Sequence, residues 1–485
     1  MTPTSNRPRT PSEAPLVVAS NRGPATFEPG LGGKLGPVHA AGGVAPILAE
    51  ALRDRQATWL CTAMSDGDRK VRSKEIDGIQ VRFVNLPPDI FEAAYNQISN
   101  GVLWFAHHAL WDLPHQPVFD EEMWRAWRGF ATANRAFATA MTEASGASAA
   151  VKIGRGRPVF LCEDYHLALA PAMIREGAPG ARIAHFSHTP FADPASLGVL
   201  PDQIRDELVG GMLGADLIGF HADRWAENFR AAAMKLDGVR AAGPRNVRVG
   251  GREVRIAVYP LTPPASIAAG AAGEDVARIR AKLAKPAGHA VVLRVDRMEL
   301  SKNIVRGFLA FEEFLRTDRS TRGHVTHIAL LSPTRGEVPG YREYAAACRR
   351  EAARINDELG TKNWKPIELR VKDDHAEVLA AYGIYDVLLV NPIVDGLNLV
   401  AMEGPLVNER DGVLVLSRNA GSFERLGRAA LGVNPFDVTE QATAIATALA
   451  MPESERAARA ASLRRAATAN PPRDWLDDQL GDLLR

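Results

Sequence analysis

Cysteine is scarce in this chain. The sequence of 485 residues contains only three, Cys61, Cys162 and Cys348, which stand far apart and lack the spacing of metal ligands. This scarcity argues against a disulfide framework and favours reduced thiols in a cytoplasmic protein. We expect each cysteine to fill space in a hydrophobic core.

Long hydrophobic runs and a surplus of charge are missing as well. No stretch approaches the roughly eighteen apolar residues of a membrane-spanning helix. The formal net charge of +1 provides no basic surface for nucleic acid or for an anionic membrane. We therefore expect small-molecule substrates as partners, with neither nucleic acid nor membrane, and the oligomeric state stays open, a homo-oligomer included.

The sequence does contain a regular alternation of short apolar runs and longer stretches of helical periodicity. This pattern is typical of α/β domains in which helices cover parallel sheets, and the chain is long enough for two such domains. Strands of a first sheet are predicted at 16–20, 158–162, 183–187, 217–220 and 254–259. Strands of a second sheet are predicted at 291–295, 327–331, 367–371, 387–390 and 413–417.

Composition and proline positions predict four segments. Residues 1–14, rich in Pro, Thr, Ser and Arg, are expected to form a disordered tail. The segment 260–264 interrupts all periodicity with three prolines, so a first domain is expected over 15–262 and a second over 263–466. Residues 467–485 contain a last amphipathic helix after a further proline pair.

A strand, turn and helix around Asp395 suggest a ligand. The apolar strand 387–390 leads into a turn with Asp395 and Gly396, and the helix that follows directs unpaired backbone amides at an anion. The residues of that first turn are Asn398, Leu399 and Val400. Asp395 is suited to accept hydrogen bonds from sugar hydroxyls, and Glu403 to accept them from a ribose. Phosphate, ribose and sugar together indicate a nucleotide sugar.

Two cations follow a strand of the same predicted sheet. Arg297 and Lys302 come just after the strand that ends near Val295 and just before a helix. Positive charge at this place suits a diphosphate leaving group, whose charge grows as the glycosidic bond breaks. Alone, a basic residue after a strand is usually a solvated surface charge. The combination with Asp395 in one half-domain favours the functional interpretation.

No metal and no cofactor are expected, because a nucleotide sugar would be a substrate. Asp66 and Asp68 match the bare pattern of a metal-binding aspartate pair. They fall between predicted strand ends in the first domain, so we interpret them as a surface turn. Arg297 and Lys302 would supply the positive charge that a metal supplies elsewhere.

Further motifs occur in a fixed order along the chain: Ser20-Asn21-Arg22-Gly23-Pro24, Cys162-Glu163-Asp164-Tyr165-His166-Leu167 and Phe186-Ser187-His188-Thr189-Pro190-Phe191. With the motifs above, they resemble the trehalose-6-phosphate synthases, and the resemblance runs from about residue 16 to 484. It implies a retaining glycosyltransferase with two Rossmann-like domains facing across a cleft, the GT-B architecture. It also implies that the C-terminal helix crosses back to the first domain; packing on the second domain is the alternative.

The resemblance implies an acceptor site for a sugar phosphate in the first domain. Arg22 matches the arginine that holds the acceptor phosphate, and Arg335 matches a second basic contact from across the cleft. Tyr95 and Trp104 match a pair that lines the acceptor pocket, and Trp59 matches a third acceptor aromatic. Flat aromatic faces complement pyranose rings. Any one of these aromatic residues, taken alone, would more often be core.

The resemblance also assigns donor and reacting groups. Gly42 and Gly43 match a glycine pair at a helix start that lets backbone amides approach the donor phosphates. Asp164 and His188 follow consecutive strands and should meet at the cleft, with His188 at the donor sugar and Asp164 at the acceptor or the reacting region. The residues expected to act in catalysis are Asp164, His188, Arg297, Lys302 and Asp395.

The chain departs from the family pattern around the donor site. Glu163 stands in place of histidine, Glu299-Leu300-Ser301-Lys302-Asn303 in place of Asp-Tyr-Ser-Lys-Gly, and Met402 in place of lysine. These departures resemble an actinobacterial branch that also contains pseudo-glycosyltransferases and has been associated with GDP-sugars. They bear on which nucleotide is preferred.

Three functions follow from these patterns. The first is synthesis of α,α-trehalose 6-phosphate from glucose 6-phosphate and an NDP-glucose, with GDP-glucose expected ahead of UDP-glucose. The second is a pseudo-glycosyltransferase that joins a nucleotide-activated cyclitol to a cyclitol or sugar phosphate. The third is a catalytically silent sugar-phosphate sensor. Intact acceptor and donor motifs favour the first.

Overall fold

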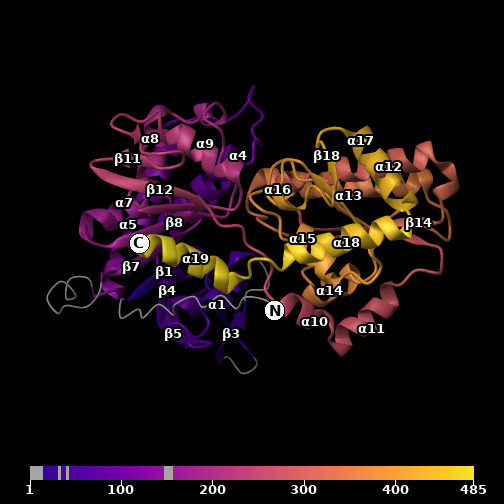
Figure 1. The fold of residues 1–485 in the computed structure, drawn as a ribbon, viewed down its shortest axis with the longest axis horizontal. Helices are drawn as coiled ribbons and strands as arrows, with labels where there is room; N and C mark the ends of the chain where they lie inside the picture. Colours follow the sequence, from indigo (N-terminus) through magenta and orange to yellow (C-terminus); the bar gives the residue numbers. More distant parts are fainter. Residues whose placement is uncertain (1–14, 31–33, 40–42, 147–156) are drawn as a thin grey trace, which may run out of the picture.

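The computed structural model describes residues 15–30, 34–39, 43–146 and 157–485. The predicted tail at 1–14 and the predicted donor residue Gly42 lie outside the described residues. Figure 1 shows two lobes side by side, the first drawn in indigo and magenta and the second in orange and yellow. Each lobe is built on its own sheet, as the alternating sequence pattern predicts.

The first domain is built on a ten-stranded sheet in the order β10-β11-β12-β9-β8-β7-β1-β4-β6-β5. The strands are β1 (Leu16–Ser20), β4 (Ala57–Thr62), β5 (Ser73–Ile76), β6 (Ile79–Val84), β7 (Val159–Glu163), β8 (Arg182–Ser187), β9 (Leu217–Phe220), β10 (Arg240–Ala241), β11 (Val247–Val249) and β12 (Arg252–Val258). From β12 to β6 all neighbours are parallel. Beside this sheet lies an antiparallel hairpin of β2 (Ala25–Pro29) and β3 (Leu35–His39).

The second domain is built on a parallel six-stranded sheet in the order β15-β14-β13-β16-β17-β18. Its strands are β13 (Ala290–Arg297), β14 (Val325–Ser332), β15 (Ile367–Val371), β16 (Val387–Val390), β17 (Val413–Ser417) and β18 (Leu431–Val433). Strand order runs outward from β13 in one direction and from β16 in the other. This is the doubly wound Rossmann order, in which ligands bind where the direction reverses.

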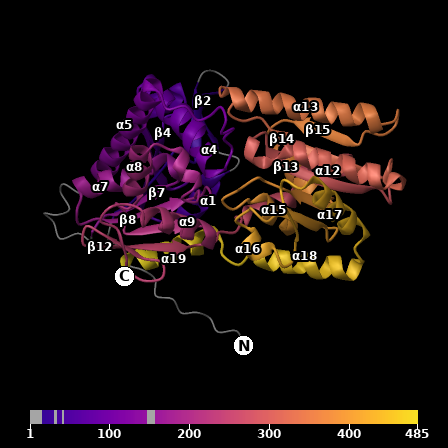
Figure 2. The same cartoon turned by 90° about the horizontal axis from the view of Figure 1, so that it is seen from above.

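Helices cover both faces of each sheet (Figures 1 and 2). The first domain carries α1 (Val44–Leu52), α2 (Asp66–Val71), α3 (Pro88–Phe91), α4 (Trp104–His107), α5 (Glu121–Ala144), α7 (Ala170–Gly177), α8 (Asp202–Met212), α9 (Asp223–Ala233) and a π-helical segment at Glu92–Leu103. The second carries α10 (Ser266–Ala271), α11 (Glu274–Leu283), α12 (Ile304–Thr317), α13 (Pro339–Leu359), α14 (His375–Tyr382), α15 (Val400–Val407), α16 (Phe423–Leu426), α17 (Val438–Ala450) and α18 (Glu453–Ala467). Among the described residues, no helix combines the length and apolar character needed to cross a membrane.

The predicted surface turn at Asp66 and Asp68 is wrong. Both residues belong to α2, which Ser65 caps, and Asp68 is fully buried. Its carboxylate accepts backbone hydrogen bonds from Phe27 at 2.7 Å, Met64 at 2.9 Å and Ser65 at 3.0 Å. Three such bonds replace the water that a buried carboxylate loses. Asp68 therefore ties the hairpin to α2.

The C-terminal helix α19 (Pro472–Leu484) returns to the first domain, which confirms the predicted crossing (Figure 2). It packs against α1, β8 and β9. Trp475 is fully buried there, with its ring 4.9 Å from that of Phe186 and 5.7 Å from that of His188. The helix thus covers the back of a predicted catalytic residue. The exact bounds of the two domains stay a prediction.

Replacing Trp475 by alanine is expected to destabilise the first domain by about 3–5 kcal/mol, because a large buried ring leaves a cavity that the backbone only partly fills. Urea unfolding followed by far-UV circular dichroism measures this loss. Arg473→Ala, an exposed change in the same helix, serves as control. Equal unfolding midpoints for the two variants would contradict the burial of Trp475.

Candidate active site

Loops from the two sheets contact each other at the carboxyl ends of the strands. In the first sheet the strand order reverses between β1 and β7, which lead to Arg22 and Asp164. In the second it reverses between β13 and β16, which lead to Lys302 and Asp395. Arg335, which follows β14, crosses the cleft: its guanidinium carbon is 4.1 Å from the ring centroid of Trp104. The two ligand-binding edges therefore form one site.

The predicted donor residues Lys302 and Asp395 lie in direct contact. The ammonium Nζ of Lys302 donates to Oδ2 of Asp395 at 2.6 Å, and each side chain is 14% exposed. Burial tends to lower the pKa of Lys302, but the carboxylates of Asp395, Asp296 and Glu299 outweigh it and raise that pKa. Burial tends to raise the pKa of Asp395, and Lys302 outweighs it in the opposite direction. Both groups are held in their charged forms.

Arg297 lies at the end of β13 beside the first domain. Its side chain is 49% exposed, and Nη2 is 3.0 Å from Oε1 of Glu299, whose side chain is completely buried. The guanidinium also lies 5.9 Å from the ring centroid of Trp104. Arg297 is therefore positioned by a buried carboxylate and leaves part of its charge open to a ligand.

The turn at Gly396 presses against the first domain. A Cβ atom on Gly396 would lie 2.0 Å from the carbonyl oxygen of His188, so only glycine fits. The carbonyl of Gly396 accepts a hydrogen bond of 2.9 Å from Nε1 of Trp225 in α9. The predicted sugar-binding turn is thus fixed from across the cleft by the Trp225 side chain and by the close approach of the His188 backbone.

The helix after this turn begins as predicted. Asn398 has a φ of 70° and bonds Oδ2 of Asp395 through Nδ2 at 3.1 Å, while its Oδ1 accepts from the amide of Ala401. Leu399 and Val400 form the start of α15, where the first helical amides have no carbonyl one turn behind them. Glu403 accepts a hydrogen bond of 3.1 Å from Tyr382, and burial raises the pKa of its carboxyl against that bond.

On the acceptor side, the structure brings Arg22 and Tyr95 together. Nη2 of Arg22 donates to the hydroxyl of Tyr95 at 3.3 Å. Arg335 donates to the hydroxyl of Tyr341 at 2.6 Å and to that of Tyr165, in the first domain, at 3.5 Å. Burial tends to raise the pKa of Tyr95, but the charges of Arg22 and Arg335 outweigh it and lower the pKa. The positive charges of Arg22 and Arg335 therefore both act on the hydroxyl of Tyr95.

Several buried polar atoms around this place have no hydrogen-bond partner within the described part of the chain. They are Nδ2 of Asn100, Nε1 of Trp104 and Nδ1 of His166. Buried donors are normally satisfied, so unsatisfied ones beside two arginines suit an anionic, hydroxyl-rich ligand. A small cavity adjoins them, lined in part by Asn21, Thr62, Tyr95 and His166.

Trp59 does not join this group. Its side chain is completely buried in the core of the first domain, and Nε1 donates to Oγ of Ser20 at 2.8 Å. The residue at the end of the same strand that lines the cavity is Thr62. Strand alternation explains this, because residues of one strand face different sides of the sheet. The structure favours a core role for Trp59.

Asp164 and His188 meet, as predicted from consecutive strands. Oδ1 of Asp164 accepts a hydrogen bond of 3.1 Å from the amide of His188, and Asp164 has a φ of 71°. The imidazole of His188 is fully engaged: Nε2 is 2.9 Å from Oε2 of Glu163, and Nδ1 is 3.0 Å from Nε2 of His221. Its ring nitrogens therefore face protein groups, and the atom nearest the donor turn is the backbone carbonyl.

Glu163 and His221 are groups that the motifs did not assign. Burial raises the pKa of Glu163 against the influence of His188, and burial lowers the pKa of His221. Glu163 was visible in the sequence as a departure from the family pattern, so that signal could have identified it. His221 follows β9 and carries no such signal, because only the fold places it beside His188.

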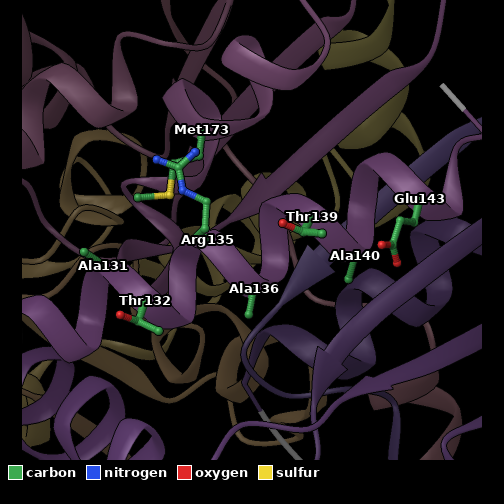
Figure 3. Close-up of a pocket in the computed structure, with 8 residues that line it drawn as sticks. All are labelled: Ala131, Thr132, Arg135, Ala136, Thr139, Ala140, Glu143 and Met173. Carbon is green, nitrogen blue, oxygen red and sulfur yellow. The ribbon is translucent and has the colours of Figure 1, made fainter. Parts of the chain in front are cut away.

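Gly43 is the N-cap residue before α1 and has a φ of 77°, a conformation that favours glycine, and its role at the donor phosphates stays a prediction. A hollow of about 670 Å³ lies on α5 and is lined by residues from Ala131 to Glu143 and by Met173 of α7 (Figure 3). No predicted site residue lines it.

Within the described ranges, no group of three or more His, Cys, Asp or Glu side chains could hold a metal ion.

Known proteins are similar to this chain over most of its length. A bifunctional trehalose-6-phosphate synthase/phosphatase of Thermoproteus tenax is 32% identical over 97% of this chain, which spans 63% of that relative. A validamine 7-phosphate valienyltransferase of Streptomyces hygroscopicus subsp. jinggangensis is 31% identical over 92% of this chain and 89% of the relative.

Solved structures confirm the predicted GT-B architecture. An α,α-trehalose-phosphate synthase (UDP-forming) from Burkholderia xenovorans, in complex with glucose-6-phosphate, matches with a TM-score of 0.82 at 29% identity, over 97% of this chain and 100% of that one. The family model for glycosyltransferase family 20 matches residues 16–485. The chain therefore belongs to glycosyltransferase family 20.

Proposed function

We propose that this protein transfers glucose from a nucleoside diphosphate to the anomeric hydroxyl of glucose 6-phosphate, giving α,α-trehalose 6-phosphate. The observation that carries the proposal is the buried Lys302–Asp395 pair on one edge of the cleft, opposite the Arg22–Tyr95 pair on the other. The first pair suits a sugar diphosphate, and the second suits a phosphorylated hexose. The domain over 15–262 would bind the acceptor, and the domain over 263–466 the donor.

Charge on the leaving group dominates the mechanism. As the bond between the sugar C1 and the diphosphate breaks, its electron pair moves to the phosphate oxygen. Lys302, Arg297 and the first amides of α15 stabilise that charge. The acceptor hydroxyl attacks from the same face and gives its proton to the departing phosphate, so configuration at C1 is retained. Asp395 and Asn398 hold the sugar hydroxyls.

No protein carboxylate is assigned as nucleophile. Oδ2 of Asp395 accepts from Nζ of Lys302, and this carboxylate is assigned to the donor sugar hydroxyls, while Oδ1 of Asp164 accepts from the amide of His188. A front-face reaction within one ion pair needs no covalent intermediate. Isolation of a glycosyl ester on a carboxylate of this enzyme would contradict it.

A cyclitol phosphate is the alternative acceptor. The similarity to a valienyltransferase supports this possibility, and a pocket built on phosphate contacts would accept either ring. Trp104, Tyr95 and Arg335 lie together as glucose 6-phosphate would require, which is why we favour the hexose. We further propose GDP-glucose ahead of UDP-glucose, on the departures at Glu299–Asn303 and Met402.

A matrix of donors and acceptors tests these proposals. UDP-, GDP- and ADP-glucose would each be combined with glucose 6-phosphate and with a valienol-type phosphate, and released nucleoside diphosphate would be measured. Highest turnover with glucose 6-phosphate is expected. Turnover only with the cyclitol phosphate would support the alternative. Sugar-phosphate binding without turnover in every combination, and also with a nucleotide-activated cyclitol as donor, would indicate a silent sensor.

Activity is expected to be unchanged in excess EDTA. Arg297 and Lys302 supply the positive charge that a divalent ion would otherwise place on the diphosphate. The measurement compares initial rates of nucleoside diphosphate release before and after dialysis against EDTA, with Mg²⁺ restored in a control. A loss of rate that Mg²⁺ reverses would show that the two cations are not sufficient.

A further inference from the structure

We propose that Arg294, a guanidinium buried beneath the donor loops, positions the two halves of the donor site relative to each other. Arg294 lies within β13 and is completely buried. It is a positioning residue, because its contacts are with protein groups that carry Lys302 and Asp395. The inference rests on the proposed function and extends it to a residue outside the substrate-contacting set.

One guanidinium contacts both loops. Nη1 donates to Oδ2 of Asp296 at 2.7 Å and to the backbone carbonyl of Lys302 at 3.1 Å. Nη2 donates to Oδ1 of Asn391, the first residue after β16. Lys302 belongs to the loop after β13, and Asn391 opens the loop that leads to Asp395. The two donor loops are thus joined twice, by the ion pair of Lys302 with Asp395 and by the hydrogen bonds of Arg294.

Asn391 extends the connection into a closed network. Its Nδ2 donates to Oε1 of Gln441 in α17 at 2.6 Å. Asn303, with a φ of 59°, donates from Nδ2 to the carbonyls of Asn391 at 2.9 Å and Pro435 at 2.6 Å. Asn303, Asn391 and Gln441 are all at most 2% exposed. The backbone of both donor loops is therefore held by side chains that water does not reach.

Stability alone does not account for such a network. Taking a cation out of water is costly, and a well-packed apolar side chain often stabilises a core equally well. Removing only Arg294 takes the guanidinium donor away from Oδ2 of Asp296 and Oδ1 of Asn391, which loosens the connection between their loops. A guanidinium holds its donors in a fixed plane and can direct them at separate groups, which gives it a directional control that an ammonium lacks. The network is suited to holding the two donor loops in fixed positions relative to each other.

Gly307 provides independent support. A Cβ atom at this position of α12 would lie 2.5 Å from Nη2 and 3.2 Å from Cζ of Arg294. The helix therefore contains glycine where the guanidinium passes. Gly307→Ala would displace the guanidinium without removing its charge, which separates geometry from charge in an experiment.

The test compares the variants Arg294→Met, Arg294→Lys and Gly307→Ala with the wild type. The control variant is Arg316→Met, which changes a half-exposed arginine of α12, the helix that contains Gly307. Calorimetry measures binding of UDP and GDP, steady-state kinetics measure kcat and both KM values, and urea unfolding measures stability. Arg294→Met is expected to lower kcat about 10²-fold, the effect of a misplacement near 1 Å. Nucleoside diphosphate binding should weaken about tenfold, while KM for the acceptor changes less than about twofold.

Arg294→Lys should recover only part of the kcat and of the nucleoside diphosphate binding that Arg294→Met loses. Gly307→Ala should also lower both, while its stability stays near that of the wild type. The inference is overturned if Arg294→Met or Gly307→Ala leaves donor binding and kcat within about twofold of the wild type. It is also overturned if both KM values change together in proportion to lost stability. If Arg294→Met does not fold, Gly307→Ala decides. Failure of the wild type to bind either nucleotide would refute the proposed function and, with it, this inference. If the wild type binds a nucleotide normally, a negative result with the variants counts against the inference about Arg294 alone.

Discussion

Lys302→Met is expected to lower kcat by about 10²- to 10³-fold at saturating donor, because it removes a buried cation that the proposed function assigns to the departing diphosphate. The stem of methionine preserves most of the packing, so the loss measures charge. Single-turnover release of nucleoside diphosphate isolates the chemical step. The expected change in acceptor KM is small, since Lys302 lies on the donor edge.

Two further variants make this result interpretable. Lys282→Met removes an exposed lysine of α11 and should leave the rate unchanged. Arg297→Ala removes the half-exposed second cation and should also lower kcat, with less effect on stability. A Lys302→Met enzyme with an undiminished single-turnover rate would show that the diphosphate is bound elsewhere.

Arg335→Ala is expected to raise KM for glucose 6-phosphate by about 10²-fold, the effect of losing a charge-assisted hydrogen bond worth about 1.5–3 kcal/mol. Arg335 reaches from the second domain to Trp104 and Tyr165. With unphosphorylated glucose as acceptor, the variant and the wild type should differ little, because the lost partner is the phosphate. Steady-state kinetics with both acceptors measure the difference.

Arg342→Ala provides the matched control. Arg342 lies in the same segment, is exposed, and bonds the carbonyls of Gly336 and Glu337. It should leave both acceptors unaffected. An Arg335→Ala enzyme that lost activity equally with glucose and with glucose 6-phosphate would show that Arg335 supports the cleft and does not bind phosphate.

Strands that are continuous apolar runs could be predicted from the sequence, whereas strands of mixed composition could not. Strand β16 and strand β17 are continuous apolar runs, and both appear as predicted. Strands β4 and β6 mix polar and apolar residues and were not predicted. They are nevertheless part of the sheet, because pairing with β1 and packing under helices supply what their local pattern lacks.

The aromatic residues show where a motif ceases to be informative. Trp59 and Trp104 were both assigned to the acceptor pocket. Trp104 does lie under Arg335, whereas Trp59 is a core residue bonded to Ser20. Residue type could not separate them, because the direction of a side chain depends on strand register and on the packing around it.

By itself, the sequence determined the α/β class, the division into two domains, the presence of a last amphipathic helix and the loops that bear Lys302, Arg335 and Asp395. These depend on local patterns and on strand ends, which chain order records. The return of the last helix to the first domain was implied only by the family resemblance, and the tertiary structure decided it. Only the tertiary structure revealed that Glu163 and His221 occupy both nitrogens of His188 and that Arg294 joins two loops from below. Such contacts form between residues far apart in the chain. A buried polar group without a partner is costly, so each of these groups is paired with another that only the fold brings near, and no local pattern indicates the pairing.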